Sequence, residues 1–170
     1  NIERLKSAAT SPLVSAIEDN AKQLLDFAQV KAGLMAYEVG KGTPKQSKEM
    51  KDSRIYHSRK KIDESYTTYL DGKDVCRFSR GWSGEYLKYG RNLAAPRKIE
   101  LFNQPRILVR QIPSKPPYCI HACFVEGFIL NDRNSMNIVS IECDPHFLLG
   151  VLNSKATSYW FIHKFGKLQR

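Results

Sequence analysis

The sequence of 170 residues contains no long hydrophobic run, and no stretch approaches the length of a membrane span. It shows no signal peptide. Hydrophobic residues make up 42% and charged residues 26%, which is typical of a folded domain and not of a disordered chain. We therefore expect one cytoplasmic domain without membrane contact. Because residue 1 is asparagine and not an initiator methionine, we expect the sequence to be a piece of a longer protein.

Cysteine is scarce, and none of the four cysteines forms a Cys-x-x-Cys pair. Isolated thiols in a chain without secretory features predict unpaired, buried cysteines. Cys119, His121 and Cys123 alternate, so they would share one face of a strand. Neighbours on that face lie about 7 Å apart, which is too far for all three to bind one metal ion. The spacing therefore predicts core packing and no metal site.

Catalytic motifs are also missing. The spacing of a phosphate-binding loop is absent, and no glycine-rich turn suited to a nucleoside cofactor is present. Residues 115–118 (KPPY) have the form of the Asn/Asp/Ser-Pro-Pro-Tyr/Phe loop of amino-methyltransferases. The first residue of that loop must accept a hydrogen bond from the amino group of the base, and the ammonium of Lys115 has only donors. We interpret the stretch as a rigid, extended turn.

Two triplets, Glu49-x-Lys51 and Asp71-x-Lys73, match half of a metal-dependent nuclease motif. Such triplets arise easily by chance, and no Pro-Asp partner precedes either of them. We interpret Gly72-Lys73-Asp74 as a structural turn, in which Lys73 either faces phosphate or pairs with Asp74. No catalytic residue, metal or cofactor is therefore predicted within this sequence.

Acidic residues are outnumbered, with 17 against 27 basic residues, for a net charge of +10. The excess is uneven, since residues 1–40 have a net charge of −1, residues 41–61 of +6 and residues 73–98 of +5. Both basic segments also contain aromatic residues. A run of charge is most often only a solvated surface, but two such segments in one domain favour a polyanionic partner.

Helix signals occur near both ends of the sequence. Ser11-Pro12 predicts a helix start with Ser11 as the N-cap, and apolar residues at helical spacing extend this helix to about Val30. Asp144-Pro145 repeats the pattern and starts one long C-terminal helix. Asn153-Ser154-Lys155 would lie at its centre, where we expect these polar residues to tie the helix to a sheet. Residues 1–11 are expected to be a linker or the tail of a preceding domain.

Short runs of strand-forming residues lie between these helices. Strands are predicted at 34–39, 54–57, 66–70, 85–89, 106–112, 118–125 and 136–142. Residues 45–53 are polar and basic, and we expect a mobile loop there. The order of elements indicates an α+β domain whose mixed, mostly antiparallel twisted sheet is flanked by an N-terminal helix and a long C-terminal helix.

Five ordered stretches carry a family resemblance. They are AGLMAYEVGKGTPK from residue 32, YLDGKDVCRF from residue 69, WSGEYLKYGRNLAAPR from residue 82, FNQPRILVRQI from residue 102 and LLGVLNSKATSYWF from residue 148. Each is weak alone, but together, in this order and over residues 24–165, they resemble the TaqI-like C-terminal specificity domain. Such domains are the target-recognition part of type IIG restriction–modification enzymes and related adenine-specific DNA methyltransferases.

The resemblance implies that double-stranded DNA is the partner and that a methyltransferase domain, often with a nuclease domain, lies upstream in the same chain. The parent protein would use S-adenosyl-methionine, and Mg²⁺ if it also cuts DNA. The recognition domain would occupy residues 12–170, without catalysis of its own, and continue past Arg170. The alternatives are a specificity-subunit or protein-interaction module without an attached catalytic domain, and a self-contained nuclease or methyltransferase.

Base reading needs forked hydrogen-bonding groups, and close backbone approach needs glycine. The stretch SRGWSGEYLKYGRN and the predicted strand at 54–57 offer both kinds of group. The base-reading candidates are Arg80, Trp82, Tyr86, Arg91, Asn92, Arg54 and Tyr56. A hairpin with Trp82 or Tyr89 in the core would be the structural alternative.

Phosphate contacts supply affinity that does not depend on sequence. Each basic residue can equally be an ordinary surface residue. The phosphate candidates are Lys41, Lys45, Lys48, Arg59, Lys60, Lys61, Lys73, Arg77 and Lys98.

Overall fold

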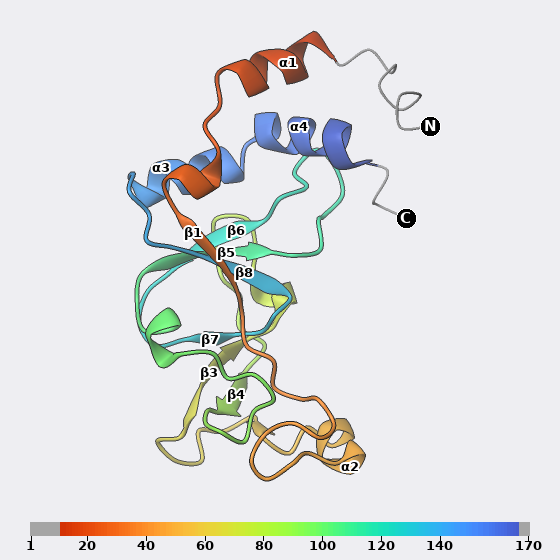
Figure 1. Ribbon diagram of the computed structural model, residues 1–170, viewed down its shortest axis with the longest axis vertical. Helices are drawn as coiled ribbons and strands as arrows, with labels where there is room; N and C mark the ends of the chain where they lie inside the picture. Colours follow the sequence, from red (N-terminus) through yellow and green to blue (C-terminus); the bar gives the residue numbers. More distant parts are fainter. Residues whose placement is uncertain (1–10, 167–170) are drawn as a thin grey trace.

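The computed structural model describes residues 11–166. Two four-stranded sheets follow one another along the long axis of the molecule, with the helices α1, α3 and α4 at one end and α2 at the other (Figure 1). This α+β architecture with mostly antiparallel sheets confirms the predicted fold class. None of the helices in the described part is long and apolar enough to cross a membrane.

The larger sheet is entirely antiparallel and has the order β1-β8-β5-β6. Its strands are β1 (Gln29–Ala32), β8 (Ser135–Val139), β5 (Arg106–Arg110) and β6 (Ala122–Val125). Ile107 lies opposite Ile138 in the register, and both side chains are buried. The sheet therefore has a continuous apolar centre.

The smaller sheet has the order β2-β4-β3-β7. Its strands are β2 (His57–Ser58), β4 (Glu85–Lys88), β3 (Tyr66–Leu70) and β7 (Leu130–Asn131). Only the β3–β7 pair is parallel. The short strand β7 was not predicted, because two residues are too few to show an alternating pattern.

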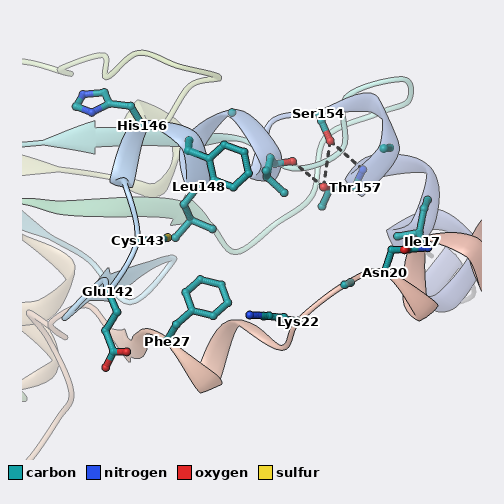
Figure 2. A pocket seen from close by; sticks show the side chains of 15 residues that line it. Ile17, Asn20, Lys22, Phe27, Glu142, Cys143, His146, Leu148, Ser154 and Thr157 are labelled. Atoms are coloured by element: carbon teal, nitrogen blue, oxygen red, sulfur yellow. Dashed lines mark hydrogen bonds between the residues drawn. The ribbon is translucent and has the colours of Figure 1, made fainter.

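The helical end is built from α1 (Pro12–Asp19), α3 (Pro145–Leu152) and α4 (Lys155–Phe165). Leu148 and Leu149 of α3 pack on Ile107 and Ile138 of the larger sheet. A groove of about 1030 Å³ lies between α3 and the segment after α1 (Figure 2). Its lining is mostly apolar.

The N-terminal helix is shorter than predicted. It ends at Asp19, because the side chain of Asn20 donates back to the carbonyl of Ala16 and closes the last turn. The following residues form a 3-10 turn, η2 (Leu24–Asp26), and strand β1, whose backbone pairs with β8. The Ser11 side chain does not cap the helix, and its Oγ lies 2.9 Å from the Tyr159 hydroxyl of α4.

Other boundaries differ from the prediction as well. The strand expected at 118–125 is reduced to Ala122–Val125, and the strand expected at 136–142 ends at Val139. Residues 34–39 make only isolated bridges at Leu34 and Met35, because β1 lies upstream. Residues 45–53 contain the short helix α2 (Lys48–Asp52), whose N-cap Ser47 accepts a hydrogen bond from the Met50 amide. Arg54 has a φ of 49°, which a strand cannot contain, so that strand is limited to β2.

The long C-terminal helix is broken into α3 and α4 at Asn153 and Ser154. The Ser154 hydroxyl accepts from the Thr157 amide and starts α4. The buried side-chain amide of Asn153 donates through Nδ2 to the Ala122 carbonyl at 2.9 Å. Its Oδ1 accepts from the backbone amide of Ala122 at 3.0 Å. Asn153 therefore ties the helical end to β6, as predicted.

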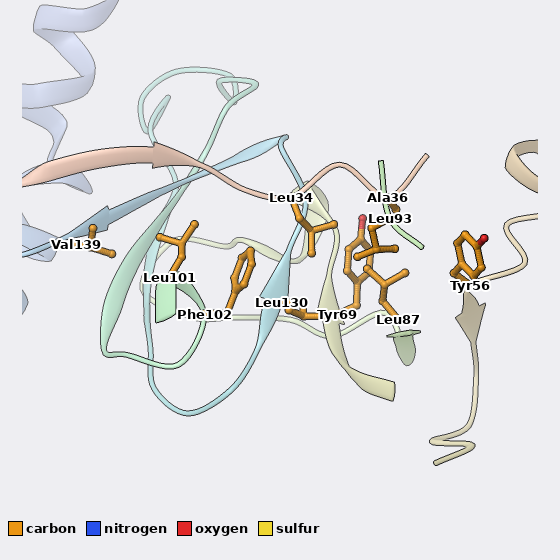
Figure 3. Close-up of a cluster of buried hydrophobic side chains, with 10 residues drawn as sticks. All are labelled: Leu34, Ala36, Tyr56, Tyr69, Leu87, Leu93, Leu101, Phe102, Leu130 and Val139. Carbon is orange, nitrogen blue, oxygen red and sulfur yellow. The ribbon is translucent and has the colours of Figure 1, made fainter. Parts of the chain in front are cut away.

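Buried side chains fill the space beside the smaller sheet (Figure 3). Leu34, Leu87, Phe102 and Leu130 are fully buried there. Cys119 and Cys123 are buried, unpaired thiols, which confirms the prediction for these two residues. These packed regions give the surface loops a fixed base.

Candidate DNA-recognition surface

Strand pairing joins the two basic segments of the sequence. His57 of β2 lies opposite Leu87 of β4, and Ser58 lies opposite Tyr86. Parts of residues 41–61 and 73–98 therefore meet at the smaller sheet, at the end of the molecule away from α1, α3 and α4 (Figure 1). Their net charges of +6 and +5 exceed the +10 of the whole chain, so the positive charge is concentrated in these two segments. We call residues 41–61 and 79–92 the recognition surface.

Hydrogen bonds fix the loop before α2 to the loop after β4. The Thr43 amide donates to the Arg91 carbonyl at 2.8 Å. The buried side chain of Gln46 donates to the carbonyls of Ala36 and Asn92 and accepts from the Glu38 amide. Lys41 and Lys45 are exposed on this loop. The loop that carries them is therefore held by a buried glutamine, a support that the sequence analysis did not identify.

Arg54 is engaged within the protein. Its two terminal nitrogens donate to the two carboxylate oxygens of Glu85 at 2.9 Å each. Burial acts to raise the pKa of Glu85, but the hydrogen bonds and charge of Arg54 lower it overall. Since the fork of Arg54 is occupied by Glu85, the structure offers it no free geometry for a guanine edge.

Tyr56 lies in the core and not on the surface. Its ring stacks on Tyr37 with centroids 5.7 Å apart, and its amide donates to the Tyr37 hydroxyl at 2.8 Å. Figure 3 shows it among the buried side chains next to the smaller sheet. The expectation that Arg54 and Tyr56 read bases from a strand is therefore corrected, because residues 54–56 are not a strand and Tyr56 is buried.

Trp82 is a surface residue, with 45% of its area exposed. Its indole N–H donates to the Glu85 carbonyl at 2.9 Å, and its ring meets Tyr86 edge to face with centroids 5.2 Å apart. Gly84 has a φ of +76°, which a side chain would strain, and the Arg59 guanidinium donates to the Ser83 carbonyl beside it. The structure thus holds the exposed Trp82 and the half-buried Tyr86 in a defined orientation next to a cation.

The other base-reading candidates differ in the exposure and hydrogen bonding of their side chains. Arg80 and Arg91 are exposed. Arg80 follows a loop that is closed by hydrogen bonds from the Cys76 amide to the Ser79 carbonyl and from the Gly81 amide to the Asp74 carbonyl. Asn92 is half-buried, and its side chain donates to the Lys88 carbonyl at 3.1 Å. Arg80 and Arg91 therefore remain the best-placed guanidinium groups.

The phosphate candidates do not all lie together. Lys48 and Lys60 are exposed on the recognition surface, whereas Lys61 pairs with Glu64 at 2.8 Å. Lys73 is exposed and does not pair with Asp74, whose carboxylate accepts from the Asp71 amide and the Ser83 hydroxyl.

Lys98 and Arg77 lie apart from this group. Lys98 lines a hollow beside β1. Arg77 packs on Tyr118, whose ring also lies near Lys155 at the start of α4.

Buried polar groups lie behind the recognition surface. Nδ1 of His57 lies 3.0 Å from the Tyr37 hydroxyl, and burial, together with the charge of Arg54, lowers the pKa of His57 to about 4. Burial and the neighbouring Asp71 raise the pKa of Asp132 to about 7. His57 is therefore neutral at physiological pH, and Asp132 is the group that titrates there.

Within residues 11–166, no three His, Cys, Asp or Glu side chains converge so that they could hold a metal ion. The groove in Figure 2 is lined by Ile17, Phe27, Leu148 and Val151, with Lys22 as the basic side chain. Its apolar lining does not fit DNA, so the basic face at the smaller sheet is the better binding surface.

Comparison with known families agrees with this geometry. Residues 67–170 match the TaqI-like C-terminal specificity domain, which is more than half of the chain. The match starts within β3 and includes β4, whereas the resemblance noted over residues 24–66 lies outside it. No curated protein matches the chain. The chain belongs to the family of TaqI-like C-terminal specificity domains, and its role is DNA target recognition in a restriction–modification enzyme.

Proposed function

We propose that the recognition surface reads the target sequence for an attached adenine-specific DNA methyltransferase. The observation that carries the proposal is the pairing of β2 with β4, which joins two basic segments around the exposed Trp82. Cations there neutralise phosphates and release counterions, while forked side chains reach base edges in the major groove.

Each part of the surface has a separate role in this proposal. Arg80 and Arg91 read bases, because both are exposed and lie on loops tied down by hydrogen bonds. Trp82 and Tyr86 pack against the sugar and base edges beside them. Lys41, Lys45, Lys48 and Lys60 contact phosphates. Arg54 and Glu85 shape the surface from beneath, since their charges are paired with each other.

The catalytic parts of the enzyme belong to the proposal and lie outside the described residues. The methyltransferase domain precedes this segment in the same chain and uses S-adenosyl-methionine, and an accompanying nuclease would use Mg²⁺. A family of DNA target-recognition domains supports this arrangement. The domain from residue 12 onward then places these catalytic groups on the target site.

Selection from a pool of randomised duplexes tests the reading of sequence. The 170-residue chain is immobilised, bound duplexes are amplified over several rounds, and enriched sequences are compared. We expect one short motif to dominate. Retention of DNA without any enriched motif would contradict sequence reading and leave only general polyanion binding.

Salt dependence and turnover separate the alternatives. If about six phosphates are contacted, affinity should fall roughly a thousandfold between 50 and 200 mM salt. A flat response would favour a protein-interaction module. Methylation or cleavage of DNA by the pure chain with methyl donor and Mg²⁺ would show that it is an enzyme in its own right.

A further inference from the structure

Two cations contact one tyrosine ring at the helical end of the molecule. The guanidinium carbon of Arg77 lies 3.9 Å from the centroid of the Tyr118 ring, and Lys155 Nζ lies 5.6 Å from it. Arg77 comes from the loop after η3 (Gly72–Asp74), Tyr118 from the β5–β6 connection and Lys155 from the start of α4. We call these three residues the Tyr118 site.

The three segments are fixed by hydrogen bonds. Arg77 Nε donates to the Asn153 carbonyl at 3.1 Å, and the Phe78 amide donates to the Ala122 carbonyl at 2.8 Å. The Cys119 amide donates to the buried Ser158 hydroxyl at 3.0 Å. The site is therefore organised before any ligand arrives, which lowers the entropy cost of binding.

The positive charge of this site has no carboxylate partner in the described residues. The ion pairs among residues 11–166 are Arg54–Glu85, Lys61–Glu64 and Glu18–Lys164. Neither Arg77 nor Lys155 belongs to them. Two like charges near one ring repel each other, so a bound anion that neutralises them would be favourable.

Arg106 shows how this fold satisfies an arginine that serves only the structure. It is fully buried, and its three nitrogens donate to the Asn137 side chain and to the carbonyls of Phe102 and Ile129. In Arg77 only Nε has a partner among residues 11–166. The two terminal nitrogens of Arg77 remain as a fork, the geometry that binds phosphate with two hydrogen bonds.

The surroundings add to the positive potential. Lys115 is exposed on the same loop as Tyr118, which the Ser114 amide closes by donating to the Cys119 carbonyl. Burial lowers the pKa of the nearby His121, and the charges of Arg110 and Arg77 lower it further. This direction is the one expected where cations lie close together without an anion.

We propose that Arg77 and Lys155 bind a phosphate of the DNA backbone outside the sequence that is read. This inference rests on the proposed function and adds a contact beside the start of α4 to the recognition surface, whose Arg80 lies three residues from Arg77. Tyr118 orients both cations. Because Arg77 packs on its ring, Tyr118 is not a free platform on which an unpaired base could stack.

The test measures binding of the 170-residue chain to a fluorescent 30-base-pair duplex of mixed sequence from 50 to 200 mM salt. Arg77→Gln and Lys155→Gln should each lower the slope of log affinity against log salt by about 0.9 and weaken binding roughly fivefold at the lowest salt. Tyr118→Leu should give a smaller loss, since both cations stay but lose their support. Lys31→Gln, an exposed lysine on β1, is the matched control and should change neither quantity.

The outcomes distinguish a failure of the Tyr118 site from a failure of the proposed function. If the wild-type chain and Lys60→Gln differ as expected but Arg77→Gln and Lys155→Gln do not, the Tyr118 site is wrong and the recognition surface stands. An equal loss in Lys31→Gln would also overturn the site, because only total charge would then matter. Failure of the wild-type chain to bind DNA would instead contradict the proposed function. Should Arg77→Gln unfold at lower temperature, the exposed Lys155 decides the result.

Discussion

Arg54 and Glu85 form a two-pronged ion pair, with both terminal nitrogens of the arginine 2.9 Å from the two oxygens of the carboxylate. The pair joins the segment after α2 to the first residue of β4, across 31 positions of sequence. The carbonyl of Glu85 also accepts the indole N–H of Trp82. Glu85 thus connects a partly exposed charge pair to the most exposed aromatic side chain of the recognition surface, which makes Glu85 a positioning residue.

Removal of this carboxylate should lower stability. We expect Glu85→Gln to reduce the free energy of unfolding by about 1–3 kcal/mol at pH 7, because Arg54 then loses a charged acceptor. The pKa of Glu85 is lowered in the folded state, so its stabilising effect is present above the unfolded pKa and is lost as pH falls through the folded pKa. Urea unfolding of the wild type and the variant at pH 7 and at about pH 3 measures the loss of stability and its dependence on pH. A difference between wild type and variant that persists unchanged at the lower pH would contradict the ion pair.

Replacement of Arg80 or Arg91 should affect DNA binding in a sequence-dependent way, unlike replacement of the lysines of the recognition surface. Arg80→Ala and Arg91→Ala are expected to cost about 1–3 kcal/mol on the selected duplex and much less on a scrambled one, because a base contact is lost. Lys60→Ala should weaken both equally and reduce the salt slope by about one. Lys61→Ala should have a smaller effect, since Lys61 is paired with Glu64.

Titration of these four variants against both duplexes measures the difference, with Lys31→Ala as the control. Equal losses on both duplexes for the arginine variants would place the base-reading residues elsewhere. Trp82 and Tyr86 would then be examined first, since the side chain of Arg54 is already occupied by Glu85.

The sequence was sufficient where a pattern is local. Residues 66–70 are rich in β-branched and aromatic side chains, and they form β3 with the predicted ends. Asp144-Pro145 started α3 as predicted, with the Asp144 side chain accepting from the Phe147 amide. The family resemblance was found from ordered motifs, and the match over residues 67–170 confirms it.

The features that were not predicted depend on contacts between residues far apart in the sequence. Nothing around Arg54 indicates that Glu85 will take its side chain, so a forked surface group was predicted where the structure has an ion pair. The break between α3 and α4 depends on Asn153 bonding to Ala122 of β6, and a helical pattern alone reads through it. Strand β1 exists because β8 pairs with it, although its own residues continue an apolar helical spacing.

Asn153 offers a test of how the helical end is held. Its side chain satisfies both the amide and the carbonyl of Ala122 and also donates to the Leu149 carbonyl at 3.0 Å. Asn153→Ala leaves buried backbone groups without partners, which costs about 1–3 kcal/mol for each group that stays unsatisfied. Asn153→Asp keeps an acceptor but loses the donor and adds a buried charge, so it should also destabilise. Thermal unfolding measures both, and a midpoint equal to wild type in either variant would show that the bond is dispensable.

Asp71 and Asp132 should make stability fall as pH rises toward neutrality. Burial and the neighbouring Asp71 raise the pKa of Asp132 to about 7, so between its unfolded value near 3.8 and about 7 the folded state binds more protons than the unfolded state. The free energy of unfolding therefore decreases with pH over that range. In Asp71→Asn the amide oxygen can still accept from the Gly72 amide, as the Asp71 carboxylate does at 2.7 Å, but the neighbouring negative charge is gone. The decrease should then become smaller without disappearing, since burial of Asp132 remains.

Urea unfolding from pH 5 to pH 8 compares the two slopes, with Asp63→Asn as the control for an exposed aspartate outside this pair. A wild-type slope that Asp71→Asn leaves unchanged would mean that the two carboxyl groups do not share this coupling.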